Sequence, residues 1–164
     1  MKRYLLTVLA ATGALVALGA ESAGAVATVT FTKPEGYVDM PFAPWDKERV
    51  MKDLRQHFDK LGAQLPQGQE LKVEVLDIDL AGQIEPRSRG THDIRVLRGG
   101  ADWPMIQLRY SIESQGKVLK SGEKRVADMN YLQNHINKYA ANEPLRYEKR
   151  MLDDWFSKLM RDER

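Results

Sequence analysis

The feature that most constrains the fold is a long stretch of strict alternation in the second half of the chain. Apolar and polar residues alternate along PMIQLRYSIES, which is the period of a strand with one buried and one exposed face. The residues Ser114-Gln115-Gly116-Lys117 then form a turn, and VLKSGEKRVA returns as the hairpin partner. The chain is therefore expected to build an antiparallel sheet whose apolar face carries Ile106, Leu108, Tyr110 and Ile112.

A second strand, predicted from Glu70 to Gly82, contains an interruption in its alternation. Its apolar residues fall into two sets of opposite phase, Leu71, Val73 and Val75 and then Leu76, Ile78 and Leu80. A β-bulge between Val75 and Leu76 would keep both sets on the core face and turn Asp77 and Asp79 outward. A strand buried on both faces would instead bury two unpaired aspartates, which costs several kcal/mol each, so the bulge is favoured.

The segment from Lys47 to Leu61 has the periodicity of an amphipathic helix. Asp46 before it is suited to be an N-cap, and Gly62 after it is a stop signal. Its apolar residues recur at intervals of three and four, namely Val50, Met51, Leu54, Phe58 and Leu61. Covering the protein's own sheet is a simpler role for this stripe than binding a partner.

A second helix is predicted near the end of the chain. Asn142 would cap it and Pro144 would lie in its first turn. Its apolar side carries Leu145, Leu152, Trp155, Phe156 and Leu159. The spacing of Tyr131, Leu132, His135, Ile136 and Tyr139 predicts a further short helix over residues 128–139.

Two shorter strands complete the predicted secondary structure. Residues 27–32 alternate with Val29 and Phe31 toward the core, and residues 92–98 would carry Ile94 and Val96 inward. The order is thus strand, helix, several antiparallel strands and helix. It predicts a single α+β domain over residues 26–164, with a mainly antiparallel sheet and with the N-terminal-half helix and the C-terminal helix on one face.

Residues 1–25 have the pattern of a secretory signal peptide. Lys2 and Arg3 precede an apolar run from Leu5 to Ala20, and Ala23-Gly24-Ala25 supplies a cleavage motif of small residues. A retained membrane helix is the alternative, but the run is at the short end of the ~20 residues that a span needs. The chain has no cysteine, which excludes a lipid on cysteine and any disulfide. We expect a periplasmic protein with no stable membrane anchor after cleavage, although secretion is equally compatible with the composition.

Charge and motifs exclude several classes of function. The formal net charge is +2, which argues against general electrostatic binding of nucleic acid. No serine lies in a nucleophile elbow, and no P-loop or dinucleotide-binding glycine pattern occurs. The sequence therefore predicts no catalytic residue and no cofactor.

Several segments, in order, resemble an exported proteobacterial family that is known as a domain of unknown function, DUF3016. They are LKVEVLDIDLAG, EPR, DIRVLRG, ADWP, LRYS, GKVLKSGE, ADMNYL and LRYEKRMLDDWF, and the resemblance runs from about Val29 to Phe156. His92 and His135 lie outside these segments. The resemblance implies no particular activity, cofactor or catalytic residue.

The stretch from Leu76 to Pro104 contains the candidate ligand-binding residues. Four arginines lie close together there, Arg87, Arg89, Arg95 and Arg98. The glycines next to them give the backbone conformational freedom. Guanidinium groups are suited to binding phosphate or carboxylate, so an anionic component of the cell envelope is a candidate ligand. Acidic residues in the same stretch can neutralise these arginines, and a structural ion-pair network is the alternative.

Asp77 and Asp79 are the candidate metal ligands, because residues two apart on a strand point to the same side. Glu85, His92 and Asp93 would complete a set of oxygen and nitrogen ligands. The spacing matches no standard calcium or zinc motif, and pairing with the nearby arginines is the simpler interpretation.

In the last helix, Trp155 and Tyr147 are the candidate partner-binding residues. Trp155 is adjacent to Phe156, so only one of the two can lie at the centre of the core-facing stripe. The other lies at its margin, and tryptophan is enriched at binding hot spots. Taken together, the sequence favours a non-catalytic binding or envelope-accessory module for an anionic envelope group or a protein partner. The alternative is a metal-dependent hydrolase that uses the Asp77 and Asp79 region.

The signal-peptide prediction is tested by the mass of the processed protein. Because Ala23-Gly24-Ala25 ends the predicted signal, the protein recovered from the periplasm should begin at Val26. Intact-mass spectrometry measures this directly. A mass that still includes residues 1–25 would contradict cleavage and favour a retained anchor.

Overall fold

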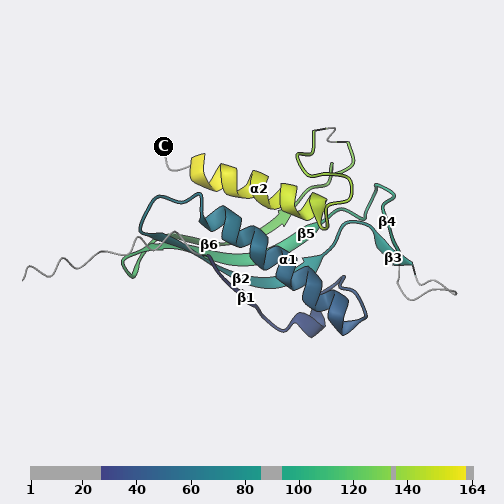
Figure 1. Ribbon diagram of the computed structural model, residues 1–164, viewed down its shortest axis with the longest axis horizontal. Helices are drawn as coiled ribbons and strands as arrows, with labels where there is room; N and C mark the ends of the chain where they lie inside the picture. The colour runs from purple at the N-terminus through teal and green to yellow at the C-terminus, as the bar shows by residue number, and fades with distance from the viewer. Residues whose placement is uncertain (1–26, 86–93, 134–135, 162–164) are drawn as a thin grey trace, which may run out of the picture.

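The computed structural model describes residues 27–85, 94–133 and 136–161 (Figure 1). Its elements, in chain order, are β1 (Ala27–Phe31), the short 3-10 helix η1 (Pro34–Gly36), α1 (Pro44–Gly62), β2 (Gln69–Asp79), β3 (Gln83–Glu85), β4 (Ile94–Val96), β5 (Met105–Ser114), β6 (Lys117–Ala127) and α2 (Arg146–Arg161). Both α-helices pack on one face of the main sheet. The predicted α+β class is confirmed.

The main sheet has four strands in the order β1-β2-β5-β6. β2, β5 and β6 are antiparallel neighbours, as predicted, whereas β1 pairs parallel with β2. A parallel pair needs a crossover connection, and α1 supplies it between β1 and β2. The β5–β6 hairpin closes through Gln115 and Gly116, which both have positive φ, as a tight two-residue turn requires.

The predicted bulge in β2 is present at the expected step. Val75 pairs with Leu108 and Asp77 pairs with Gln107, so Leu76 is the extra residue. Val75 and Ile78 consequently both lie in the core, with no exposed surface. Leu76 itself is only half-buried, so the expectation that it lies with the core set is wrong. The extra residue Leu76 shifts the inward and outward alternation of the β2 side chains by one position.

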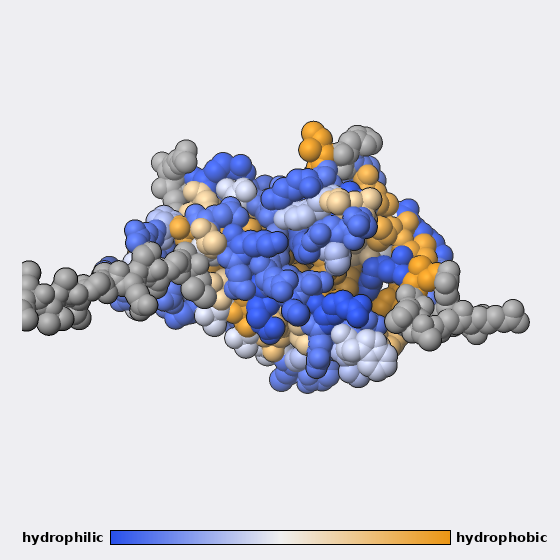
Figure 2. All heavy atoms as spheres, in the orientation of Figure 1, coloured by the Kyte–Doolittle hydropathy of each residue, from blue (hydrophilic) through white to orange (hydrophobic). Residues whose placement is uncertain are grey.

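The core fills the space between the sheet and the two helices. Its fully buried side chains include Leu54, Phe58, Leu71, Val75, Ile78, Ile106, Leu108, Ile112 and Leu152. The outward faces of the helices are hydrophilic (Figure 2). No helix within the described ranges is long and apolar enough to cross a membrane.

The second face of the sheet is polar, as the alternation predicts. Arg109 lies at its centre and forms ion pairs with Glu74 on β2 and Glu123 on β6. Glu74 also accepts a hydrogen bond from the Thr32 hydroxyl. These cross-strand contacts join three strands on a face that no described helix covers.

The short helix predicted over residues 128–139 is wrong, because the described part of this segment forms turns. Asp128 accepts a hydrogen bond from the backbone N–H of Asn130, and the Asn137 side chain accepts one from the N–H of Tyr139. Such local bonds from Asp and Asn compete with helix formation. Apolar spacing alone did not reveal this competition.

Both helices begin at residues other than those predicted. α1 starts at Pro44, with Ala43 as its N-cap, and Asp46 lies in the first turn, where it pairs with Arg49. α2 starts at Arg146 rather than after Asn142, because Leu145 has a φ of 53° and cannot belong to a right-handed helix.

The strand predicted at residues 92–98 is shorter than expected and belongs to a separate ribbon. β4 pairs with β3 and does not join the main sheet. Ile94 is exposed and Val96 is half-buried, so the expectation that both point into the core is wrong. Neither α-helix makes substantial contact with this ribbon, so its apolar residues remain near the surface.

The position of Leu152 shows that α2 is an integral part of the core. Its side chain is fully buried, and truncation to alanine should lower the free energy of unfolding by about 2–5 kcal/mol. Leu119→Ala is the control, because Leu119 is 50% exposed and its truncation should change stability by only about 0.5 kcal/mol. Urea unfolding measures both variants. Equal, small losses would show that α2 is a detachable arm.

Candidate functional site

Arg95, one of the candidate anion ligands, is engaged in contacts within the protein. Its Nη1 lies 2.6 Å from Asp39 Oδ2 and 3.1–3.3 Å from the carbonyl oxygens of Leu80, Ala81 and Gly82, and its two N–H groups are shared among these four acceptors. These contacts attach β4 to the turn that follows β2. Four acceptors within the protein surround this nitrogen, which supports the structural alternative for Arg95.

The other candidate arginines do not join Arg95 in a described cluster. Arg98 forms an ion pair with Glu85 across the ends of β4 and β3, and both side chains are exposed. Arg87 and Arg89 lie outside the described residues. An anion site made by all four arginines therefore stays a prediction, and the exposed pair by itself contributes little to stability.

Asp77 and Asp79 lie on the polar face of the sheet, as the bulge predicted. Asp77 Oδ1 accepts hydrogen bonds from the N–H groups of Val38 and Ile78, each at 2.9 Å. The pKa of Asp79 is raised by burial and by the nearby carboxylates of Asp39 and Asp77. Asp77 thus holds the segment after η1 against β2.

Of the additional metal ligands suggested by the sequence, Glu85 alone lies within the described residues. Glu85 pairs with Arg98, and His92 and Asp93 lie outside the described residues. Within the parts of the chain that the structure describes, no three His, Asp or Glu side chains form a group that could hold a metal ion. The metal alternative therefore has no described geometry in its support.

A buried glutamate that the sequence did not reveal reinforces the turn after β2. Glu148 on α2 is 3% exposed, and its Oε1 accepts a hydrogen bond from the N–H of Ala81 at 2.8 Å. Burial raises the pKa of this carboxyl group. Glu148 and Arg95 thus both contact the turn after β2, Glu148 through the N–H of Ala81 and Arg95 through its carbonyl oxygens. In the sequence, Glu148 looks like an ordinary charged residue of an amphipathic helix.

A second polar cluster joins α1 to α2 and to the segment that precedes α2. His57 on α1 is 2% exposed, and its Nε2 lies 3.2 Å from Asp153 Oδ1. Tyr139 donates to Asp153 Oδ2 at 2.7 Å, and Lys138 lies 2.8 Å from the same oxygen. Burial opposes ionisation of Asp153, but His57, Lys138 and Tyr139 together lower its pKa to about 2. The cluster packs the helices together, and His57 is too buried to meet a substrate.

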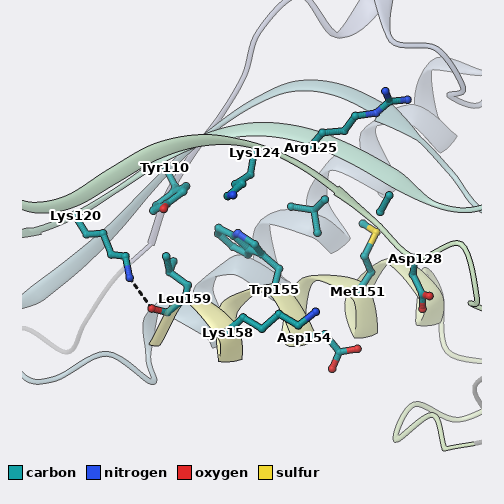
Figure 3. A pocket seen from close by; sticks show the side chains of 12 residues that line it. Tyr110, Lys120, Lys124, Arg125, Asp128, Met151, Asp154, Trp155, Lys158 and Leu159 are labelled. Atoms are coloured by element: carbon teal, nitrogen blue, oxygen red, sulfur yellow. Dashed lines mark hydrogen bonds between the residues drawn. The ribbon is translucent and has the colours of Figure 1, made fainter. Parts of the chain in front are cut away.

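A groove of about 730 Å³ lies between β6 and α2 (Figure 3). Tyr110 and Trp155 line its inner side with their rings 5.5 Å apart in an edge-on arrangement. Trp155 is 9% exposed, whereas its neighbour Phe156 is 2% exposed and lies in the core. The sequence-based expectation that one of these two rings lies at the margin of the core is therefore met by Trp155.

The groove exists because β6 is an edge strand with polar residues at core-facing positions. Lys120, Gly122 and Lys124 pair with Ile112, Tyr110 and Leu108, and so share the apolar face of β5. A Cβ atom at Gly122 would lie 3.1 Å from the Tyr110 hydroxyl, so glycine makes room for this ring. The Lys120 ammonium donates to the carbonyl of Leu159 at 2.8 Å and ties β6 to the last turn of α2.

Two exposed lysines line the groove, Lys124 on β6 and Lys158 on α2, and the Lys158 side chain runs along the helix toward Asp154 (Figure 3). Among the described residues, neither has an ion-pair or hydrogen-bond partner. The lining carboxylates have other contacts, since Asp154 lies 4.0 Å from Arg150 and Asp128 accepts from Asn130. The groove thus combines unpaired ammonium groups with an aromatic floor.

The two candidate partner-binding residues are not brought together. Trp155 lines the groove, whereas the Tyr147 ring packs edge-on against Tyr131 at 5.0 Å, beneath the Arg146 guanidinium. Lys124 and Tyr110 were not predicted as site residues from the sequence. A signal was available, because Lys120, Gly122, Lys124 and Val126 share one phase of β6 and only Val126 is apolar.

The contacts of Arg95 lead to a stability prediction. Arg95→Ala removes one charged donor from Asp39 and three carbonyl groups, and should lower the free energy of unfolding by about 2 kcal/mol. Arg98→Ala breaks only an exposed pair and should cost about 0–1 kcal/mol. Urea unfolding of the two variants provides the comparison. Equal effects would mean that the buried contacts of Arg95 do not support the fold.

Comparison with known proteins agrees with the resemblance seen in the sequence. Residues 25–158 match the family described as "Protein of unknown function (DUF3016)". No curated protein matches the chain, and no solved structure does. The family match covers all of the main sheet and most of α2. The chain therefore belongs to the DUF3016 family.

Proposed function

We propose that this protein is a non-catalytic binding domain that holds an anionic group in the groove between β6 and α2. The observation that supports the proposal is the pair Lys124 and Lys158, which line the groove from β6 and from α2 without a described partner. Ammonium groups that line the same hollow attract an anion into it by Coulomb interaction. Phosphate and carboxylate are the groups of suitable charge and size.

The aromatic floor adds a second requirement for the ligand. Tyr110 and Trp155 present large rings in a partly enclosed space, where apolar or ring-shaped groups gain contact area. Met151 extends this apolar lining on the α2 side. The groove is thus suited to an anionic group attached to an apolar or cyclic body, and less suited to a free inorganic ion.

The residue types of the groove favour binding over catalysis. Its described lining contains no serine, threonine, histidine or cysteine, so it lacks the usual pair of a nucleophile and a base. Together with the predicted signal peptide, this supports a periplasmic or envelope-accessory role. Phosphate and carboxylate groups are abundant in the components of a bacterial envelope.

The proposal is tested with phenyl phosphate, which combines an anionic group with a ring. The wild-type protein should bind it, and Lys124→Ala with Lys158→Ala should weaken the affinity at least about tenfold, because both ammonium groups are lost. Isothermal titration calorimetry measures the affinity. Added salt should also weaken binding to the wild type, since the attraction is electrostatic.

The matched control replaces two exposed lysines of α1, Lys52 and Lys60, by alanine. This variant has the same change in net charge but leaves the groove intact, so its affinity for phenyl phosphate should equal that of the wild type. Equal loss in both double variants would show that only overall charge matters. Absence of binding to the wild type would refute an anion site in the groove.

A further inference from the structure

β6 forms an edge of the main sheet along its whole length. It spans eleven residues and pairs only with β5. No described segment makes a backbone hydrogen bond to its outer side. An edge strand of this kind presents a row of unpaired N–H and C=O groups, to which another extended chain can add.

The side chains of β6 determine what can pair with this edge. The strand carries Lys117, Lys120, Lys124 and Arg125 but a single acidic residue, Glu123. Glu123 is already neutralised by Arg109 on β5. A second copy of β6 would place basic residues opposite basic residues, which is unfavourable across a pair of strands. The edge therefore disfavours self-association and favours an acidic chain.

The groove lies where the side chains of an added strand would point. Strands in a sheet are about 4.8 Å apart, and their side chains alternate between the two faces. Every second side chain of a fifth strand would thus point to the helix side, beside Lys124 and toward Trp155 and Lys158 on α2. Lys124 and Lys158 would pair with carboxylates at these positions.

One end of β6 limits how far such a strand can extend. The register with β5 shifts between Ile112 and Glu113, so Leu119 is an extra residue on β6. A bulge of this kind interrupts regular pairing. Val118 and Leu119, 52% and 50% exposed, lie beyond the groove at the hairpin end. Regular pairing is therefore available from Lys120 to Ala127.

From these observations we infer that an extended acidic segment of a partner protein adds to β6 as a fifth strand. Its backbone pairs with Lys120–Ala127, and alternate carboxylate side chains enter the groove. This inference rests on the proposed anion site, and it names the class of ligand that brings the anionic groups. The groove recognises charge, while the edge of β6 recognises the extended backbone.

The test uses a synthetic eight-residue peptide that alternates glutamate and valine. The full chain should bind it, and binding should protect alternate amides between Lys120 and Ala127 from hydrogen exchange, because only every second N–H faces outward. Nuclear magnetic resonance measures this pattern. The same peptide with N-methyl groups on every backbone nitrogen keeps its charges but has no N–H donors, and its affinity should fall at least tenfold. A peptide with glutamine in place of glutamate should lose affinity to a similar extent.

The result with phenyl phosphate distinguishes failure of this inference from failure of the anion site. If the methylated peptide binds as well as the unmethylated one, or if no alternate protection appears, strand addition is refuted while the anion site stands. If neither peptide binds but phenyl phosphate does, the groove takes small anions only. If phenyl phosphate and the peptides all fail to bind, both proposals are wrong and the basic edge serves only to keep copies of the protein apart.

Discussion

The burial of one apolar sheet face beneath α1 and α2 is the interaction on which the rest of the structure depends. The chain has no disulfide, so its stability comes from packing side chains such as Phe58 and Leu152 against the sheet. The bulge at Leu76 is necessary for this packing, because it keeps Val75 and Ile78 on the same face of β2. Without the bulge, half of the strand would present its aspartates to the core.

The buried polar contacts hold together the parts of the molecule that this packing does not reach. Arg95 and Glu148 both contact the turn after β2, and Asp153 joins α2 to His57 on α1. Buried charges require partners, and Arg95, Glu148 and Asp153 each have at least one hydrogen-bond partner within the fold. These polar residues therefore serve the architecture, whereas Lys124 and Lys158, which have no described partner, line the groove beside β6.

The groove is a consequence of the same layer architecture. α2 packs with Phe156 toward the core and leaves Trp155 at the margin, where it meets the edge strand. β6 is an edge strand, so its core-facing phase tolerates Lys120, Gly122 and Lys124 where a central strand would need apolar residues. One region therefore contains the aromatic floor, the two lysines without a described partner and the outer edge of β6. Because these features adjoin one another, a single added strand could occupy both the proposed anion site and the edge of the sheet.

Periodicity in the sequence by itself determined the four strands of the main sheet, the two helices, the polar face of the sheet and the bulge after Val75, because each depends on local alternation of residues. It did not predict β3. It failed where local hydrogen bonds compete with spacing, as at Asp128 and Asn137, and where backbone conformation ends a helix, as at Leu145. Only the tertiary structure decided that Arg95 is an internal tie, that Glu148 is buried and that Lys124 and Lys158 face one groove. The physical reason is that a charge acquires its role from partners distant in the sequence, and folding alone brings those partners together.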